Sequence, residues 1–266
     1  MAESLLLPSN EQTRAAWKRN VREVQKAGER QFSEHVRVSN NSKTGVSVNV
    51  PLSTCSSKTS ACSKYCYALR GPISFTNSVS VEVNNQAVFD SLKTASQQKV
   101  DYEASLIASQ VQLKGHPFLR WNGSGELTPG AVRVLEAFSR LFPTIPVWVS
   151  TRSMALARSL PPKRQSLHIM LSTDSTTSAQ NWQDTIQLKK ERDYFIAWTR
   201  IDQFEIVPKE VDVVFNLHLG IGRLDKKCVR TCPATLPNVN HDQICTKCQF
   251  CWKSDRRKKG HPLNLK

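Results

Sequence analysis

Three cysteines in one short segment have the residue type and spacing best suited to chemistry. Cys55, Cys62 and Cys66 stand in the stretch CSSKTSACSKYC, separated by six and then three residues. In a reducing compartment, thiols spaced this closely are more often metal ligands than disulfide partners. Three thiolates are what an iron–sulfur cluster has when one iron is left open for an exogenous ligand. Alternatively, a distant cysteine completes a closed metal site.

Five further cysteines lie close to the end of the sequence. They follow the spacing CxxxC, then twelve residues, then CxxCxxC, and comprise Cys228, Cys232, Cys245, Cys248 and Cys251. Zinc and a 4Fe–4S cluster each take four such ligands, so the pattern predicts a second cluster or a zinc site. A zinc knuckle that only stabilises this end of the chain is the structural alternative. The eight cysteines divide either as four and four, with Cys228 completing the upstream site, or as three, four and one.

The elements that must position these cysteines follow an alternating pattern. Helical stretches separate short apolar runs that end in polar residues, and the runs are 116–121, 145–149, 167–171, 194–198 and 211–217. Strands that alternate with helices form parallel sheets with right-handed crossovers. We therefore predict an α/β fold: a partial (β/α) barrel with parallel strands, an N-terminal helix and a C-terminal cysteine-rich metal-binding segment. A flat, doubly wound sheet is the alternative.

The sequence divides into four segments. Residues 1–34 form a basic N-terminal helix, residues 35–227 the α/β partial barrel with the cysteine loop 55–66, residues 228–252 the cysteine-rich segment and residues 253–266 a basic tail. Periodicity predicts helix over 10–31, extended chain over 35–50 and helix again over 81–113. The first helix has a basic residue at every fourth position: Arg14, Lys18, Arg22, Lys26 and Arg30. Such a row either contacts phosphates or is a solvated face that pairs with glutamates of the same helix.

Polar side chains gather where the predicted strands end. In α/β folds, the carboxyl edge of the sheet is where active sites form. The candidates at this edge are Ser124, Gly125, Glu126, Arg152, Asp174, Arg200, Asn216 and His218. Each one alone is an ordinary loop residue, but their concentration at one edge predicts a site for a cofactor or substrate.

Two of these features together resemble the radical S-adenosylmethionine enzymes. Tyr65 immediately precedes the last thiol of the cysteine loop, and a predicted strand ends in Gly123-Ser124-Gly125-Glu126 before a helix. In that superfamily, three cysteines hold a 4Fe–4S cluster at the mouth of a partial α/β barrel, with the usual spacing CxxxCxxC. The resemblance implies that the three thiols of the cysteine loop are the cluster ligands.

The same resemblance implies roles for the strand-end residues. Ser124, Gly125 and Glu126 would contact the amino group of S-adenosylmethionine, since an ammonium needs a carboxylate or carbonyl partner. The cofactor carboxylate and ribose, or the substrate, would be bound by Arg152, Asp174, Arg200, Asn216 and His218. The C-terminal cysteines would hold an auxiliary cluster or zinc near the same mouth.

Several motifs also resemble a phage-borne family named after gene product 88. They are the segment 39–45, CxxxxxxCxxxCYA, the strand end SGE, WVSTRS, LSTDS and the terminal CxxCxxCW. The similarity extends from about residue 35 to 252 and leaves the N-terminal helix and the basic tail outside. It implies the fold and metal binding rather than a particular reaction.

The net charge and the hydropathy of the sequence limit the kinds of molecule that we expect the protein to bind. A net charge of +15 indicates a polyanionic partner, and nucleic acid is the commonest in cells. No apolar run approaches the roughly 18 residues of a membrane span and no secretory signal is recognisable, so we expect no membrane partner and a cytoplasmic location. The sequence thus predicts an iron–sulfur protein of the radical S-adenosylmethionine type that acts on or near nucleic acid. The alternative is a non-catalytic nucleic-acid-binding protein stabilised by zinc or a cluster, and the oligomeric state stays open.

Overall fold

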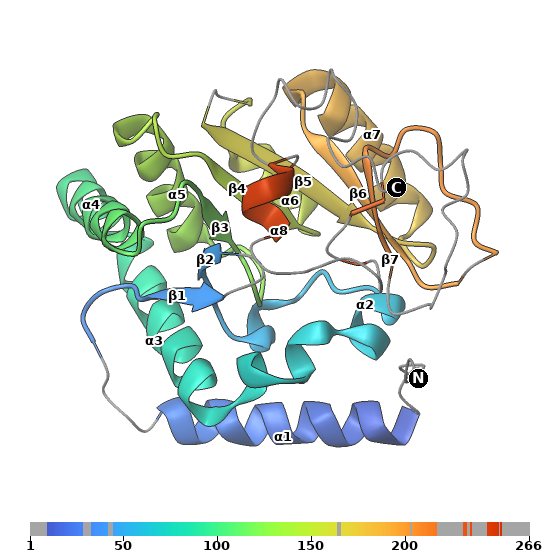
Figure 1. Ribbon diagram of the computed structural model, residues 1–266, viewed down its shortest axis with the longest axis horizontal. Coiled ribbons are helices and arrows are strands. Elements are labelled where there is room, and N and C mark those ends of the chain that lie inside the picture. Colours follow the sequence, from blue (N-terminus) through green and yellow to red (C-terminus); the bar gives the residue numbers. More distant parts are fainter. Residues whose placement is uncertain are drawn as a thin grey trace.

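A seven-stranded sheet forms the centre of the described part of the protein (Figure 1). The computed structural model describes residues 10–28, 33–41, 45–163, 166–202, 204–216, 231–232, 235, 244–249 and 251. The strands are β1 (Val38–Asn41), β2 (Gly45–Val48), β3 (Leu119–Trp121), β4 (Val147–Thr151), β5 (Leu167–Thr173), β6 (Phe195–Arg200) and β7 (Val213–Asn216). Each apolar run predicted from the sequence overlaps one of the strands β3 to β7.

The strands lie in the sheet in the same order as in the sequence. β2 to β7 are parallel to one another, as predicted. β1 instead pairs antiparallel with β2, with Val38 opposite Val48. Only residues 42–44 join these two strands, too few for the crossover that a parallel pair needs, so the segment predicted to be extended over 35–50 forms a hairpin outside the parallel part of the sheet. β1 and β7 are the edges of the described sheet and do not pair with each other.

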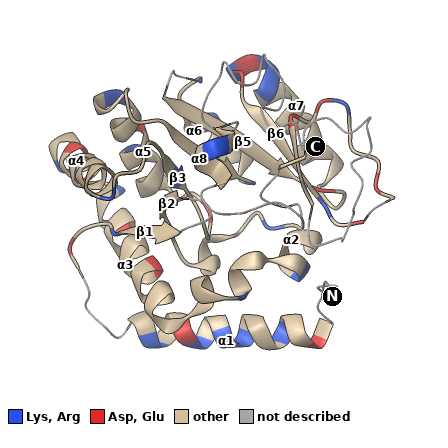
Figure 2. Cartoon of the chain, viewed as in Figure 1, with Lys and Arg blue, Asp and Glu red and all other residues tan. Residues whose placement is uncertain are grey.

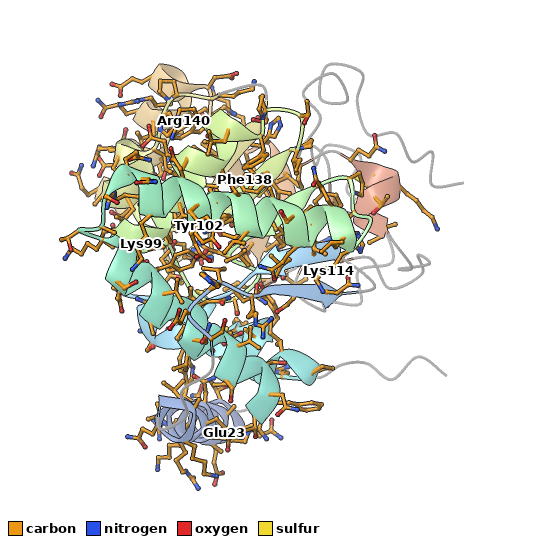
Figure 3. All side chains as sticks on the ribbon, turned by 90° about the vertical axis from the view of Figure 1, so that its left-hand side faces the viewer. Glu23, Lys99, Tyr102, Lys114, Phe138 and Arg140 are labelled. Atoms are coloured by element: carbon orange, nitrogen blue, oxygen red, sulfur yellow. The ribbon has the colours of Figure 1, made fainter. Side chains whose placement is uncertain are left out.

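Helices cover one face of the sheet. They are α3 (Thr76–Leu92), α4 (Gln97–Leu113), α5 (Pro129–Leu141), α6 (Met154–Ser159) and α7 (Ala179–Arg192). α3 and α4 both pack on α5, a layer that Figure 3 shows from the side. The main core lies between these helices and the sheet and includes Phe89, Trp121 and Phe138. The helical region expected over 81–113 is two helices, because the side chain of Ser96 caps a new one by accepting a hydrogen bond from the backbone N–H of Lys99.

The opposite face of the sheet, which we call the inner face, carries the alternate side chains of the same strands. A second apolar cluster forms there from Phe118, Trp148, Met170, Phe195, Ala197 and Val213. The short helix α8 (Ile244–Cys248) packs against this cluster through Cys245 and Cys248 (Figure 1). The C-terminal cysteine-rich segment therefore covers part of the inner face.

The N-terminal helix α1 (Asn10–Gly28) lies outside these layers, against α2 (Ser60–Tyr65) and α3 (Figure 1). Trp17 donates a hydrogen bond from Nε1 to the carbonyl of Ser63 at 2.9 Å, and Thr76 donates from its hydroxyl to Glu23 at 2.7 Å. The basic residues of α1 lie on its exposed side, visible as blue bands in Figure 2. Neither α1 nor any other described helix combines the length and the hydropathy of a bilayer span.

Gly130 allows α5 to approach α3 closely. A Cβ at this position would lie 1.8 Å from the carbonyl oxygen of Phe89, a backbone atom of α3 that cannot rotate aside. We expect Gly130→Ala to lower the free energy of unfolding, measured by urea denaturation, by about 1–3 kcal/mol, the usual cost of overpacking. Gly28→Ala is the matched control, because no atom lies within 4 Å of its Cβ position. Equal losses in the two variants would contradict the close packing of α3 and α5.

Candidate metal centre

Three short helical turns form the cysteine loop, residues 55–66, and its immediate flanks. η1 (Leu52–Thr54), α2 and η2 (Tyr67–Leu69) follow one another along the chain. Thr59 caps α2, because its hydroxyl accepts a hydrogen bond from the backbone N–H of Cys62 at 3.1 Å. Cys55 follows η1, Cys62 lies inside α2, and Cys66 joins α2 to η2. Each turn therefore positions one thiol.

The three thiols of the loop interact electrostatically. Burial is the main cause that raises the pKa of each thiol, and the pKa of Cys66 rises to about 11. The charges of Cys62 and Cys66 also raise the pKa of Cys55, and that of Cys62 raises the pKa of Cys66. Cys55 and Cys66 also pack against one apolar cluster, so they lie in a shared, partly buried site, where thiolates are costly unless a cation neutralises them.

Asp174, which follows β5, holds the cysteine loop on the sheet. Its Oδ2 lies 2.8 Å from Nη1 of Arg152 in an ion pair and accepts a hydrogen bond from the hydroxyl of Thr59 at 2.6 Å. Thr176 donates to Oδ1 at 2.7 Å, and its hydroxyl accepts from the backbone N–H of Ala61 at 3.2 Å. These bonds fix the start of α2 to the carboxyl edge of the sheet.

Arg152, which follows β4, forms a hydrogen bond with the thiol of Cys62. Burial raises the pKa of Cys62, and the charge and hydrogen bond of Arg152 act against this rise. Asp174 acts in the opposite direction, so the ion pair only partly offsets the cost of burial. Arg152 therefore favours the thiolate of Cys62, which is the form that ligates metals.

Glu126 lies beside Cys55, and hydrogen bonds fix its carboxylate. Oε1 accepts from the hydroxyl of Thr151 and from the backbone N–H of Leu127, both at 2.7 Å, and Oε2 accepts from the N–H of Arg152 at 2.8 Å. Burial raises the pKa of Glu126, and these three hydrogen bonds oppose the rise. A carboxylate oxygen accepts from two directions, so Oε2 has one direction left for a further donor.

Ser124 and Gly125 shape the turn between β3 and Glu126. The hydroxyl of Ser124 donates to Glu82 on α3, and its carbonyl accepts from the N–H of Val50 at 3.3 Å. Gly125 has a φ of +73°, and a Cβ there would lie 2.3 Å from the carbonyl oxygen of Val50. Only glycine combines this backbone conformation with so close a contact, so the turn that presents Glu126 depends on it.

The predicted strand-end residues fall into two groups. Glu126, Arg152 and Asp174 meet the thiols of the cysteine loop. Arg200 and Asn216 lie opposite each other in the register of β6 and β7, farther along the same edge. The backbone N–H of Asn216 donates to the hydroxyl of Thr235 at 3.2 Å. His218 and Cys228 lie outside the described residues.

Several residues of the site were not predicted from the sequence. Thr59 had a usable signal, because it stands three residues before Cys62, the spacing of an N-cap. Glu82 had none, since only the packing of α3 brings it to Ser124. Tyr67 likewise reaches across to β3, where its hydroxyl donates to the carbonyl of Gly123.

Four of the five C-terminal cysteines lie in the described residues. Cys232, Cys245, Cys248 and Cys251 all pack on or into the apolar cluster of the inner face. Across the part of the chain that the structure describes, however, no three His, Cys, Asp or Glu side chains are arranged so that they could hold one metal ion. Among the described residues, neither these cysteines nor the thiols of the cysteine loop therefore form a tight set of ligands for one ion.

The fold and the site define an α/β protein with a cysteine loop at the carboxyl edge of a mainly parallel sheet. The chain belongs to the Gene product 88 family, whose family model matches residues 8–254. This confirms the resemblance found in the sequence and extends it over the N-terminal helix, which had been expected to lie outside. Searches of curated proteins and of solved structures find no match.

The buried carboxyl of Glu82 makes stability depend on pH. Burial raises its pKa to about 8, and the hydrogen bond from Ser124 opposes the rise. An unfolded chain ionises Glu82 near its ordinary pKa of 4.5, so between the two pKa values the folded state binds more protons. The free energy of unfolding contributed by this group therefore falls as pH rises from 4.5 towards 8, by at most about 1.4 kcal/mol per pH unit.

We expect Glu82→Gln to remove this part of the pH dependence, since the amide keeps the shape of the side chain and does not ionise. Urea denaturation from pH 5 to 9 should show the variant gaining stability relative to the unmodified protein as pH rises. Glu136→Gln on the exposed side of α5 is the control and should leave the profile unchanged. Parallel profiles for the unmodified protein and Glu82→Gln would mean that Glu82 is ionised in the folded state.

Proposed function

We propose that this is an iron–sulfur protein of the radical S-adenosylmethionine type, in which Cys55, Cys62 and Cys66 hold a 4Fe–4S cluster. The observation that carries the proposal is that hydrogen bonds hold the cysteine loop at the carboxyl edge of a mainly parallel sheet, to Asp174 through Thr59 and to Glu126 through Thr54. Strands in sequence order with helices on one face support a partial (β/α) barrel, because in such a barrel every crossover returns on the same side. A reducing cytoplasm would keep the thiols available for ligation.

Three thiols suit a 4Fe–4S cluster with one iron left open for the cofactor. Such a cluster takes one cysteine ligand on each iron, and Cys55, Cys62 and Cys66 supply three of the four. On the inner face, Cys232, Cys245, Cys248 and Cys251 are the proposed ligands of a second cluster or of zinc.

Glu126 suits the amino group of S-adenosylmethionine. The remaining acceptor direction of Oε2 matches an ammonium donor, and the three hydrogen bonds to the carboxylate hold it in place before the cofactor arrives. Ser124 and Gly125 set the position of this carboxylate. Arg200, Asn216 and His218 are the candidates for the remaining contacts to cofactor or substrate.

The bound cluster would supply the electron that cleaves a carbon–sulfur bond of S-adenosylmethionine. The residues of this chain prepare that reaction. Arg152 favours the ionised form of Cys62, and Asp174 keeps the cysteine loop against the strand ends. Glu126 orients the cofactor through its ammonium group. Catalysis thus depends on side chains that hold and orient rather than on side chains that react.

Binding of S-adenosylmethionine tests the proposal. Calorimetric titration of anaerobically purified protein should detect one site, and Glu126→Gln should raise its Kd about 10- to 100-fold, since a hydrogen bond to a charged group is lost. Glu136→Gln is the control, because its carboxylate is exposed on α5. Cys62→Ala should abolish cleavage of the cofactor while retaining the helical circular dichroism. Absence of binding in the unmodified protein, or equal affinity in Glu126→Gln, would contradict the assignment.

We propose secondly that the protein contacts nucleic acid through α1, with or without catalysis. Arg14, Lys18 and Arg22 are exposed and take part in none of the ion pairs found among the described residues. Residues four apart on a helix are about 6 Å apart along its axis, a spacing that can follow a phosphate backbone. A cavity of about 290 Å³ beside α1 is lined by further cations, Arg19, Lys64 and Arg70, and reaches Cys66. The basic surface is therefore continuous with the candidate metal centre.

Charge reversal on α1 tests this second proposal. The double variant Lys18→Glu/Arg22→Glu should weaken binding of a single-stranded oligonucleotide at least tenfold at low salt and reduce the slope of log K against log salt by about two. The matched control is Lys99→Glu/Lys114→Glu at the two ends of α4, which lies apart from α1 with α3 between them (Figure 3). Equal losses in both double variants would indicate an effect of net charge alone and contradict a specific surface on α1.

A further inference from the structure

Arg120 lies on the inner face of the sheet without an acidic partner. It is the central residue of β3, between Leu119 and Trp121, whose side chains enter the main core on the other face. The side chain of Arg120 is half-buried, and none of the ion pairs among the described residues includes it. Its Nε is buried and has no hydrogen-bond partner. Among the described residues, therefore, no carboxylate neutralises the charge of this guanidinium.

Aromatic rings hold this guanidinium in place. Its Cζ lies 5.0 Å from the ring centroid of Trp148 and 5.9 Å from that of Tyr67, and Nη2 donates to the hydroxyl of Tyr67 at 2.9 Å. Such contacts orient an arginine, but a ring face offsets only part of the cost of removing the charge from water. Replacement by a neutral side chain would avoid that cost, so the position is best explained by a use for the charge.

The surroundings of Arg120 provide a second unsatisfied donor. Asn122 directly follows the same strand and has a φ of +59°, in the left-handed region that asparagine tolerates better than most residues. Its side chain is only 5% exposed, and Nδ2 has no hydrogen-bond partner. Buried donors without partners are rare in folded proteins unless a ligand or water meets them. The end of β3 thus holds two buried donor nitrogens without a hydrogen-bond partner among the described residues. They are Nε of Arg120 and Nδ2 of Asn122.

We propose that Arg120 binds an oxyanion, a phosphate or a carboxylate, of a ligand that lies on the inner face of the sheet. The guanidinium presents parallel N–H donors that match two oxygens of such a group, and the rings of Tyr67 and Trp148 lie against it. Tyr67 directly follows Cys66, so the oxyanion site adjoins the candidate metal centre. The ligand would thereby reach from Arg120 towards the cysteine loop. The inference rests on Arg120 and its neighbours and does not require that the thiols hold a cluster.

Anion-dependent thermal stability tests this site. The protein as purified is heated in sodium phosphate, in sodium acetate and in sodium chloride of equal ionic strength. We expect phosphate or acetate at saturation to raise the Tm by about 5 °C over chloride, because a ligand that binds only the folded state stabilises it. The anion with the larger effect identifies the oxyanion as phosphate or as carboxylate.

Two variants separate Arg120 from the general basic charge. Arg120→Met should lose the anion-specific shift and, in chloride alone, be at least as stable as the unmodified protein. Arg158→Met is the matched control, since this arginine pairs with Asp184 at 2.9 Å on the helical side and should keep the full shift. An undiminished shift in Arg120→Met would overturn the proposal.

A crystal structure of the unmodified protein in the effective anion provides a test that does not depend on the folding of a variant. It should show the anion within hydrogen-bond distance of Nε and a terminal nitrogen of Arg120. Water alone beside Arg120 at an anion concentration that raises the Tm would also overturn the proposal.

Discussion

The ion pair between Arg152 and Asp174 is the interaction on which the candidate metal centre depends. It joins the ends of β4 and β5, and both partners also bind the cysteine loop, Asp174 through Thr59 and Arg152 through Cys62. The side chain of Asp174 is fully buried and that of Arg152 is 12% exposed, so loss of either partner would leave the other uncompensated. Because the loop has only short helical turns of its own, its thiols keep their position only while these anchors hold it on the sheet.

The two faces of the sheet differ because the crossovers all return on one side. Helices and the large apolar core occupy that side, which accounts for most of the burial. The inner face receives a smaller apolar cluster, the C-terminal cysteines and the unpaired charge of Arg120. Chemistry can therefore take place on the inner face and at the adjoining carboxyl edge without disturbing the core. α1 adds a basic surface next to the cysteine loop, so the charged exterior and the thiols are connected by packing as well as by sequence.

The sequence predicted the parts of the site that follow from local pattern. The spacing of the thiols is visible in the sequence itself. So are the alternation of strands and helices and the polar residues Glu126, Arg152 and Asp174 that follow the strands. The division of the helical region at Ser96 depends on a local cap that was not recognised. The contact of Tyr67 with Gly123 depends on tertiary packing instead. The position of Arg120 was not predictable, because only the assembled sheet shows that it forms no ion pair within the described part of the chain. The roles assigned to Arg200, Asn216, His218 and the C-terminal cysteines stay predictions.

The central claim is that the cysteine loop holds an iron–sulfur cluster at the carboxyl edge of the sheet. Iron, zinc and acid-labile sulfide analysis of protein purified without oxygen measures this most directly, with a Cys55→Ser/Cys62→Ser/Cys66→Ser variant analysed beside it. We expect the unmodified protein to be brown. The triple variant should contain about four irons and four sulfides fewer per chain than the unmodified protein. Colourless protein that contains zinc and no labile sulfide, or a triple variant with unchanged iron and sulfide, would contradict it.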